Sequence, residues 1–258
     1  EEEAALASAD TFEAYFLRGN DSITGTSGND YLYAGAGNDT VIAGNGNDLI
    51  IGGDGAGNDN YNGGNGADSI KYTSARAGIA VNLNTGVAKS IEGNDAAGIG
   101  TDSLSKIENV ISGNFDDSLI GSNVSNQLTG NDGNDTIDGG LGSDTLIGGS
   151  GRDTFVFDTK LGSSNIDTIT DFQSGVDKIA LAKAVFTAFK ATAAVADTFY
   201  SAAGATTGHV LSDRIIYDPA SGKLYYDADG SGKGAAVQIA LVGTTTHAQL
   251  LDTDFVVV

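Results

Sequence analysis

A nine-residue repeat in the first part of the chain most constrains how it can fold. Each unit has an acidic residue followed, two positions later, by one large apolar residue, as in Gly37-Asn38-Asp39-Thr40-Val41. A first block carries its repeating aspartates at Asp21, Asp30, Asp39, Asp48, Asp59 and Asp68, nine apart except for one step of eleven. A second block keeps the spacing of nine at Asp117, Asn126, Asp135, Asp144 and Asp153. A flexible Gly/Asn/Asp-rich linker would not need to keep this apolar residue.

The alternation of residue types predicts how each unit folds. Glycine permits the positive φ of tight turns, and a triplet with one central apolar residue suits a short strand. Two nine-residue units then make one coil of 18 residues, and successive coils stack about 4.8 Å apart. We expect the following side chains to point inward: Ile23, Leu32, Val41, Ile50, Tyr61, Ile70, Leu119, Leu128, Ile137, Leu146 and Phe155.

Stacked coils bring acidic side chains together, with Asp21 near Asp39 and Asp30 near Asp48. Two such carboxylates repel each other by about 1 kcal/mol in water. A divalent cation between them reverses the sign of this energy. Because the units offer carboxylate and carbonyl oxygens but no His or Cys, the ligand set favours Ca²⁺ over zinc or copper. One apolar side chain per unit cannot offset the backbone entropy lost on folding, so we expect the block to fold only with Ca²⁺.

The pattern Gly-Gly-x-Gly-x-Asp-x-apolar-x resembles the RTX (repeats-in-toxin) calcium-binding nonapeptide repeat, a signature of parallel β-helices. The resemblance implies an all-β fold, a right-handed parallel β-roll of 18-residue coils. It assigns several Ca²⁺ ions to the Asp carboxylates and to the carbonyls two and four residues earlier. The full ligand sets are Gly35, Gly37 and Asp39; Gly44, Gly46 and Asp48; Gly64, Gly66 and Asp68; Gly140, Gly142 and Asp144; and Gly149, Gly151 and Asp153.

Other units match the ligand pattern only in part. These are Gly28 with Asp30, Gly57 with Asp59, and Gly133 with Asp135, together with the edge positions Gly19 with Asp21, and Asp117. In the second block Asn126 replaces an aspartate, and Phe115 stands where a glycine is expected before Asp117. We therefore expect the first coil of the second block to bind Ca²⁺ weakly or not at all.

The sequence predicts five segments. They are an N-terminal helix or cap (1–18), repeat block 1 (19–72), an interrupting hairpin (73–112), repeat block 2 (113–157) and a C-terminal cap (158–258). We expect a helix over Ala4–Arg18 that covers the first coil, and a lateral hairpin on one continuous roll, although two separate rolls are an alternative. Residues 166–179 resemble the segment that follows the repeats in serralysin-type secreted proteins.

The C-terminal segment has enough apolar residues for a conventional core. We expect short helices over Ala182–Lys190 and Thr246–Leu251, a hairpin of Arg214–Asp218 with Lys223–Asp227, and strands over Ala236–Val242 and Phe255–Val258. Residues 227–232 begin like an EF-hand loop, but Gln238 stands where that loop needs Glu, so a hairpin turn is favoured over a calcium site. The acidic and apolar end at 252–258 resembles the C-terminal signal of type I secretion substrates.

Composition excludes several classes of function. The net charge of −21 disfavours nucleic acid and anionic membranes as partners, and no stretch is apolar enough to span a bilayer. The chain has no Cys and only His209 and His247 as histidines, and it lacks the common catalytic motifs. We expect a non-enzymatic module.

The resemblance implies a calcium-binding RTX module that folds outside the cell and carries the type I secretion signal of a larger protein. Its partners would be the type I secretion apparatus and an upstream cargo domain. One alternative is a surface-layer or adhesin segment assembled by calcium-mediated self-association, with Phe199-Tyr200 and Tyr225-Tyr226 as candidate contact residues. Another is the non-catalytic C-terminal domain of a secreted protease, lipase or epimerase.

Overall fold

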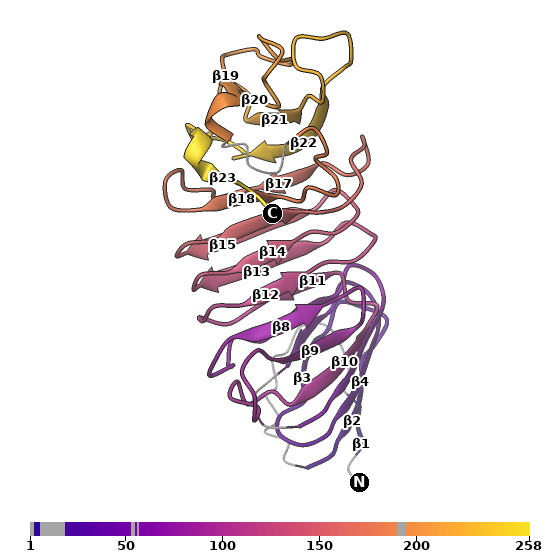
Figure 1. Cartoon of the computed structure of the whole chain (residues 1–258). Coiled ribbons are helices and arrows are strands. Elements are labelled where there is room, and N and C mark those ends of the chain that lie inside the picture. The colour runs from indigo at the N-terminus through magenta and orange to yellow at the C-terminus, as the bar shows by residue number, and fades with distance from the viewer. Residues whose placement is uncertain (1–2, 6–18, 53–54, 56, 190–194) are drawn as a thin grey trace.

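The fold is a long parallel β-roll with a β-rich cap at its C-terminal end (Figure 1). The computed structural model describes residues 3–5, 19–52, 55, 57–189 and 195–258. Over these residues the strands form two sheets. Within the repeat blocks each short strand pairs in parallel with the strand one coil further along, for example Ser22–Thr24 with Thr40–Ile42. This arrangement confirms the predicted β-roll.

Both sheets run the length of the described chain. The first, 12-stranded sheet has the order β1 (Glu3–Ala5), β2 (Ser22–Thr24), β4 (Thr40–Asn45), β6 (Asn60–Asn65), β10 (Thr101–Ser105), β9 (Val87–Ser90), β8 (Ile79–Asn82), β12 (Ser118–Ile120), β14 (Thr136–Asp138), β16 (Thr154–Phe157), β18 (Lys178–Leu181) and β23 (Phe255–Val257). The second, 11-stranded sheet has the order β19 (Phe199–Ser201), β20 (Ile215–Asp218), β21 (Lys223–Tyr226), β22 (Val237–Val242), β17 (Asp167–Ile169), β15 (Thr145–Ser150), β13 (Gln127–Asp132), β11 (Asn109–Ile111), β7 (Ser69–Lys71), β5 (Leu49–Ile51) and β3 (Tyr31–Tyr33).

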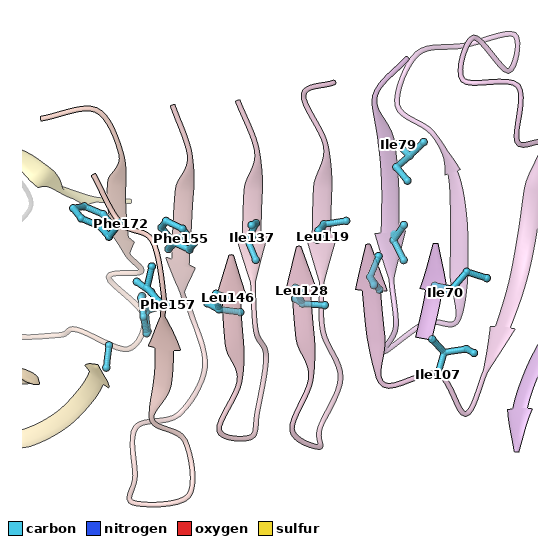
Figure 2. Packing of buried hydrophobic residues seen from close by; sticks show 14 of the residues in the cluster. Ile70, Ile79, Ile107, Leu119, Leu128, Ile137, Leu146, Phe155, Phe157 and Phe172 are labelled. Carbon is cyan, nitrogen blue, oxygen red and sulfur yellow. The ribbon is translucent and has the colours of Figure 1, made fainter. Parts of the chain in front are cut away.

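Two facing rows of apolar side chains, one from each sheet, fill the space between the sheets. All eleven residues expected to point inward are 0–2% exposed. Figure 2 shows Leu119, Ile137 and Phe155 stacked along one sheet, opposite Leu128 and Leu146 on the other. In each unit the apolar residue lies two positions after the acidic residue, in the middle of the short strand. Because alternate residues of a strand face opposite sides, this central side chain points inward while its two neighbours point outward.

The interruption at 73–112 is built into the roll. The expected hairpin exists, since β8 pairs antiparallel with β9, but it is not lateral. In the first sheet β10, β9 and β8 lie between β6 and β12, whereas in the second sheet β11 alone lies between β7 and β13. Two extra strands widen the first sheet by about 10 Å. The strands accordingly change direction between the β2–β4 and β12–β15 regions (Figure 1).

The C-terminal part extends both sheets and then closes them. β17 pairs with β22, and β18 pairs with the terminal strand β23. The predicted hairpin is confirmed as β20 and β21, which pair antiparallel. Aromatic contacts make the cap core: Phe199 lies 5.3 Å from Phe255, centroid to centroid.

The helix predictions are wrong where the structure describes them. Residues 182–189 form turns because tertiary hydrogen bonds override helix propensity: the Ala188 N–H donates to the Tyr226 hydroxyl at 2.8 Å. Residues 246–251 are not helical, since the Leu251 N–H donates to the Asp254 carboxylate at 2.8 Å. Short 3₁₀ turns occur instead at η1 (Val195–Asp197) and η2 (Asp252–Asp254). The helix expected over Ala4–Arg18 lies outside the described residues, except that Ala4 and Ala5 belong to strand β1.

Candidate calcium sites

Within the part of the chain that the structure describes, six turns share one backbone geometry, and we call them open turns. In each, the residues four and two positions before the aspartate have positive φ. The pairs are Gly35 and Gly37 (Asp39), Gly44 and Gly46 (Asp48), Gly64 and Gly66 (Asp68), Asn131 and Gly133 (Asp135), Gly140 and Gly142 (Asp144), and Gly149 and Gly151 (Asp153). Five of these are the complete ligand sets of the sequence. Asp135 joins them because Asn131 adopts φ 71°, a value that Asn tolerates better than most residues.

Close packing of turn on turn requires the glycines. The Gly46 carbonyl oxygen would lie 1.7 Å from a β-carbon on Gly66 of the next coil. The Gly133 carbonyl stands in the same relation to Gly151, also at 1.7 Å. The carbonyl oxygens of successive turns therefore line both edges of the roll, where any larger residue would displace them.

The aspartates form hydrogen-bonded ladders along both edges of the roll. The backbone N–H of one acidic position donates to a side-chain oxygen of the acidic residue one coil further along, at 2.8–3.1 Å. Before the interruption the ladders run Asp21–Asp39–Asp59–Asp102 and Asp30–Asp48–Asp68–Glu108, and after it they run Asp117–Asp135–Asp153–Asp177 and Asn126–Asp144–Asp167.

In every open turn the second carboxylate oxygen is buried and has no hydrogen-bond donor. This holds for Oδ2 of Asp39, Asp48, Asp68, Asp135, Asp144 and Asp153, whose side chains are 0–2% exposed, and also for Oδ2 of Asp21. A buried ionised oxygen without a partner is costly. Burial, together with neighbouring carboxylates, raises the pKa of Asp39 to about 6, of Asp153 to about 6 and of Asp135 to about 7.

These oxygens fit a hard divalent cation. Oxygen-only ligands on flexible turns suit Ca²⁺, and a cation would satisfy the unpartnered oxygens while cancelling the repulsion between stacked carboxylates. Among the residues that the structure describes, no group of three or more acidic or His side chains converges on one point. Backbone carbonyls would therefore have to supply many of the ligands.

The remaining sequence-predicted positions differ from the open turns. Gly28 and Gly57 do not have positive φ. Oδ2 of Asp30 accepts the Thr26 N–H at 2.5 Å, and Oδ2 of Asp117 accepts the Gly113 N–H at 3.1 Å. Gly19 does have positive φ, at 117°.

Four ladder members were missed from the sequence: Asp102, Glu108, Asp167 and Asp177. None follows a complete glycine pattern. Each is nevertheless followed two residues later by an apolar residue, for example Leu104 after Asp102. The acid-x-apolar triplet was therefore the signal that could have identified them.

A buried tyrosine and carboxylate cluster marks the widened part of the roll. The Tyr61 hydroxyl donates to Asp59 Oδ2 at 2.7 Å, and the Tyr72 hydroxyl donates to Asp102 Oδ2 at 2.8 Å. All four side chains are at most 3% exposed. Burial raises the pKa of Asp102 to about 7, and the hydrogen bond from Tyr72 partly opposes this rise.

Tyr72→Phe is expected to lower the free energy of unfolding by about 1–3 kcal/mol, because it leaves Asp102 Oδ2 buried without its donor. Denaturant unfolding in saturating Ca²⁺ measures this loss. Tyr225→Phe, at a half-buried position on β21, is the control and should change stability by less than about 0.5 kcal/mol. Equal stability of the two variants would contradict the role given to this hydrogen bond.

The loop at 227–232 turns between the antiparallel strands β21 and β22, as the hairpin prediction required. Both oxygens of Asp227 already accept backbone N–H groups, from Gly208 at 3.0 Å and from Asp229 at 3.2 Å. This loop therefore lacks the free carboxylate oxygens of the open turns.

Comparison with known proteins agrees with the geometry. The family model "RTX calcium-binding nonapeptide repeat (4 copies)" matches residues 17–50 and 39–70, and the model "Peptidase M10 serralysin C terminal" matches residues 63–257, well over half of the chain. A comparison with curated proteins gave no match.

Among solved structures, the chain is similar to the extracellular lipase LipA from Serratia marcescens, at 19% identity and a TM-score of 0.27. That match covers 97% of this chain and 41% of the lipase, so the chain spans less than half of the lipase's length. The family matches carry the assignment: the chain belongs to the peptidase M10 serralysin C-terminal family, and with its RTX repeats it is a calcium-binding module of a secreted protein.

Proposed function

We propose that this chain is a calcium-triggered folding module that carries the type I secretion signal of a larger secreted protein and has no catalytic activity of its own. The observation that carries the proposal is the set of buried, unpartnered carboxylate oxygens in the open turns. Without cations these oxygens oppose folding, and with cations they become ligands. The free energy of calcium binding therefore contributes directly to the free energy of folding.

Calcium concentration would then control where the chain folds. Weak, all-oxygen sites of extracellular modules bind in the range of about 10⁻⁴–10⁻³ M. At the far lower calcium level of the cytosol the chain would stay unfolded, which suits passage through a secretion channel. Outside the cell it would fold. In the described residues no helix is long and apolar enough to cross a membrane.

The position of the C-terminal residues supports export before folding. In the folded chain β23 is paired with β18, and the Val258 N–H donates to the Leu181 carbonyl at 3.0 Å. An unfolded chain would present these residues freely to the secretion apparatus. Fusing a reporter protein to residues 158–258 and measuring its type I export tests the secretion signal. A reporter that stays in the cell would contradict the proposal that this segment carries the signal.

Circular dichroism of the chain in EGTA, then in increasing Ca²⁺, tests the folding switch, with Mg²⁺ as the control cation. The expected result is a cooperative gain of β-sheet signal with Ca²⁺ only. A fully folded spectrum in EGTA would show that apolar burial suffices, and the switch would have to be abandoned even if calcium binds.

The adhesin alternative has less support from the structure. Its candidate contact residues are largely packed within the cap: Phe199 contacts Phe255, and Tyr226 is 6% exposed between Phe186 and Phe189. Calcium-dependent light scattering would distinguish assembly from folding of a single chain.

A further inference from the structure

Two turns of the roll, which we call hydroxyl-closed turns, replace the open geometry with a protein hydrogen bond. In the first, the Thr26 N–H and Oγ1–H both donate to the Asp30 carboxylate, at 2.5 Å to Oδ2 and 3.0 Å to Oδ1. In the second, the Ser122 N–H and Oγ–H donate to Asn126 Oδ1, at 2.7 and 3.1 Å. The oxygen left free in an open turn is therefore already paired in these two.

The two hydroxyl-closed turns have the same internal geometry. In each, the backbone N–H two residues before the acidic position donates to the hydroxyl oxygen, from Gly28 to Thr26 at 3.2 Å and from Val124 to Ser122 at 3.4 Å. Neither Thr26 nor Ser122 has positive φ. Each begins the second-sheet ladder of its own block, so the same turn occurs twice at equivalent places in the roll.

Asn126 shows what this turn requires. Its single carbonyl oxygen accepts the Ser122 donors, and its Nδ2 donates to the Glu108 carbonyl at 2.7 Å. A neutral amide satisfies every contact, and no carboxylate charge is left for a cation. Because Asp30 occupies the same arrangement, its charge is not needed for a metal either.

Two further turns are closed without a hydroxyl residue at that position. The Gly113 N–H donates to Asp117 Oδ2 at 3.1 Å, and the Gln173 N–H donates to Asp177 Oδ2 at 2.7 Å. Together with the hydroxyl-closed turns they lie near the start of each block and beyond the end of the second. Open turns lie between them.

We infer that a backbone N–H takes the place of the cation at Asp30, Asp117, Asn126 and Asp177, so that Ca²⁺ is excluded from these four turns and binds the open turns, at Asp39, Asp48 and Asp68 and at Asp135, Asp144 and Asp153. This inference rests on the proposed function and specifies which of its sites are occupied. The closed turn of Asp30 lies one coil before Asp48. The closed turns of Asp117, Asn126 and Asp177 each lie one coil from an open turn of the second block.

The matched variants Asp30→Asn and Asp48→Asn test this assignment, since both positions lie in one ladder, one coil apart. Native mass spectrometry of the full chain counts bound Ca²⁺, and a calcium titration followed by circular dichroism gives the folding midpoint. Asp48→Asn is expected to lose at least one ion and to raise the midpoint at least tenfold. Asp30→Asn is expected to keep the wild-type count and a midpoint within twofold. Loss of an ion by Asp30→Asn would overturn the inference.

A gain-of-binding variant keeps the test decisive if Asp48→Asn fails to fold. Ser122→Gly, Val124→Gly and Asn126→Asp together restore the glycines and carboxylate of an open turn, and the triple variant is expected to bind one more ion than wild type. An unchanged count in a folded triple variant would contradict the inference. A wild-type chain that binds no Ca²⁺ would instead refute the proposed function, so the two failures are distinguishable.

Discussion

Gly66→Ala is expected to destabilise the first repeat block by more than about 3 kcal/mol, because the new β-carbon would meet backbone and not a movable side chain. Gly66 has φ 145°, and its β-carbon would lie 1.7 Å from the Gly46 carbonyl oxygen. The clash displaces a carbonyl in the open turn of Asp48, so calcium binding should weaken together with folding. Thermal unfolding in saturating Ca²⁺ and the calcium midpoint measure the two effects.

Gly93→Ala is the matched control for this substitution. Gly93 lies in the hairpin region, and apart from its two chain neighbours no residue has an atom within 4 Å of the position where a β-carbon would be placed. We expect a change of less than about 0.5 kcal/mol. Similar unfolding temperatures for the two variants would mean that the turns can separate without loss, and the tight stacking described here would be wrong.

Acid is expected to favour the metal-free fold, because a proton can neutralise a buried carboxylate that lacks its cation. In the metal-free fold, burial raises the pKa of Asp39 and Asp153 to about 6 and of Asp135 to about 7, above the ordinary value of 3.8. At a pH between the ordinary pKa of 3.8 and these raised pKa values, the folded state holds more protons than the unfolded state. The metal-free fold therefore loses stability as pH rises through 6–7. In the unfolded chain the carboxylates keep the ordinary pKa of 3.8 and are ionised above pH 5. Calcium-coupled folding of that chain therefore displaces almost no protons, and its calcium midpoint should stay within about threefold from pH 5 to pH 7.

Calcium titrations followed by circular dichroism at pH 5, 6 and 7, at constant ionic strength, measure this linkage. The free Ca²⁺ concentration should be read with a calcium electrode, because chelators themselves lose affinity in acid. A midpoint that falls tenfold or more from pH 5 to pH 7 would contradict this expectation and show that these carboxylates hold their protons before the metal binds.

Much of the fold could be predicted from the sequence because the repeat is local and periodic. A spacing of two between acid and apolar residue places Leu128 and Ile137 inside, and glycine spacing marks the turns of Asp39 and Asp144. Propensity failed where distant groups took over a backbone N–H. The Tyr226 hydroxyl accepts the Ala188 N–H, for example, and the predicted helix does not form.

The sequence by itself determined the parallel roll, its inward residues and five of the six open turns, since each depends on residues within one nine-residue unit. Only the tertiary structure decided which carboxylate oxygens stay free. Asp59 has the same place in its unit as Asp39, but the Tyr61 hydroxyl donates to its Oδ2. The tertiary structure also decided the change in strand direction along the roll, which depends on how β8, β9 and β10 fit between β6 and β12. Whether an oxygen has a donor depends on the three-dimensional positions of nearby groups, and the nine-residue spacing does not record these positions.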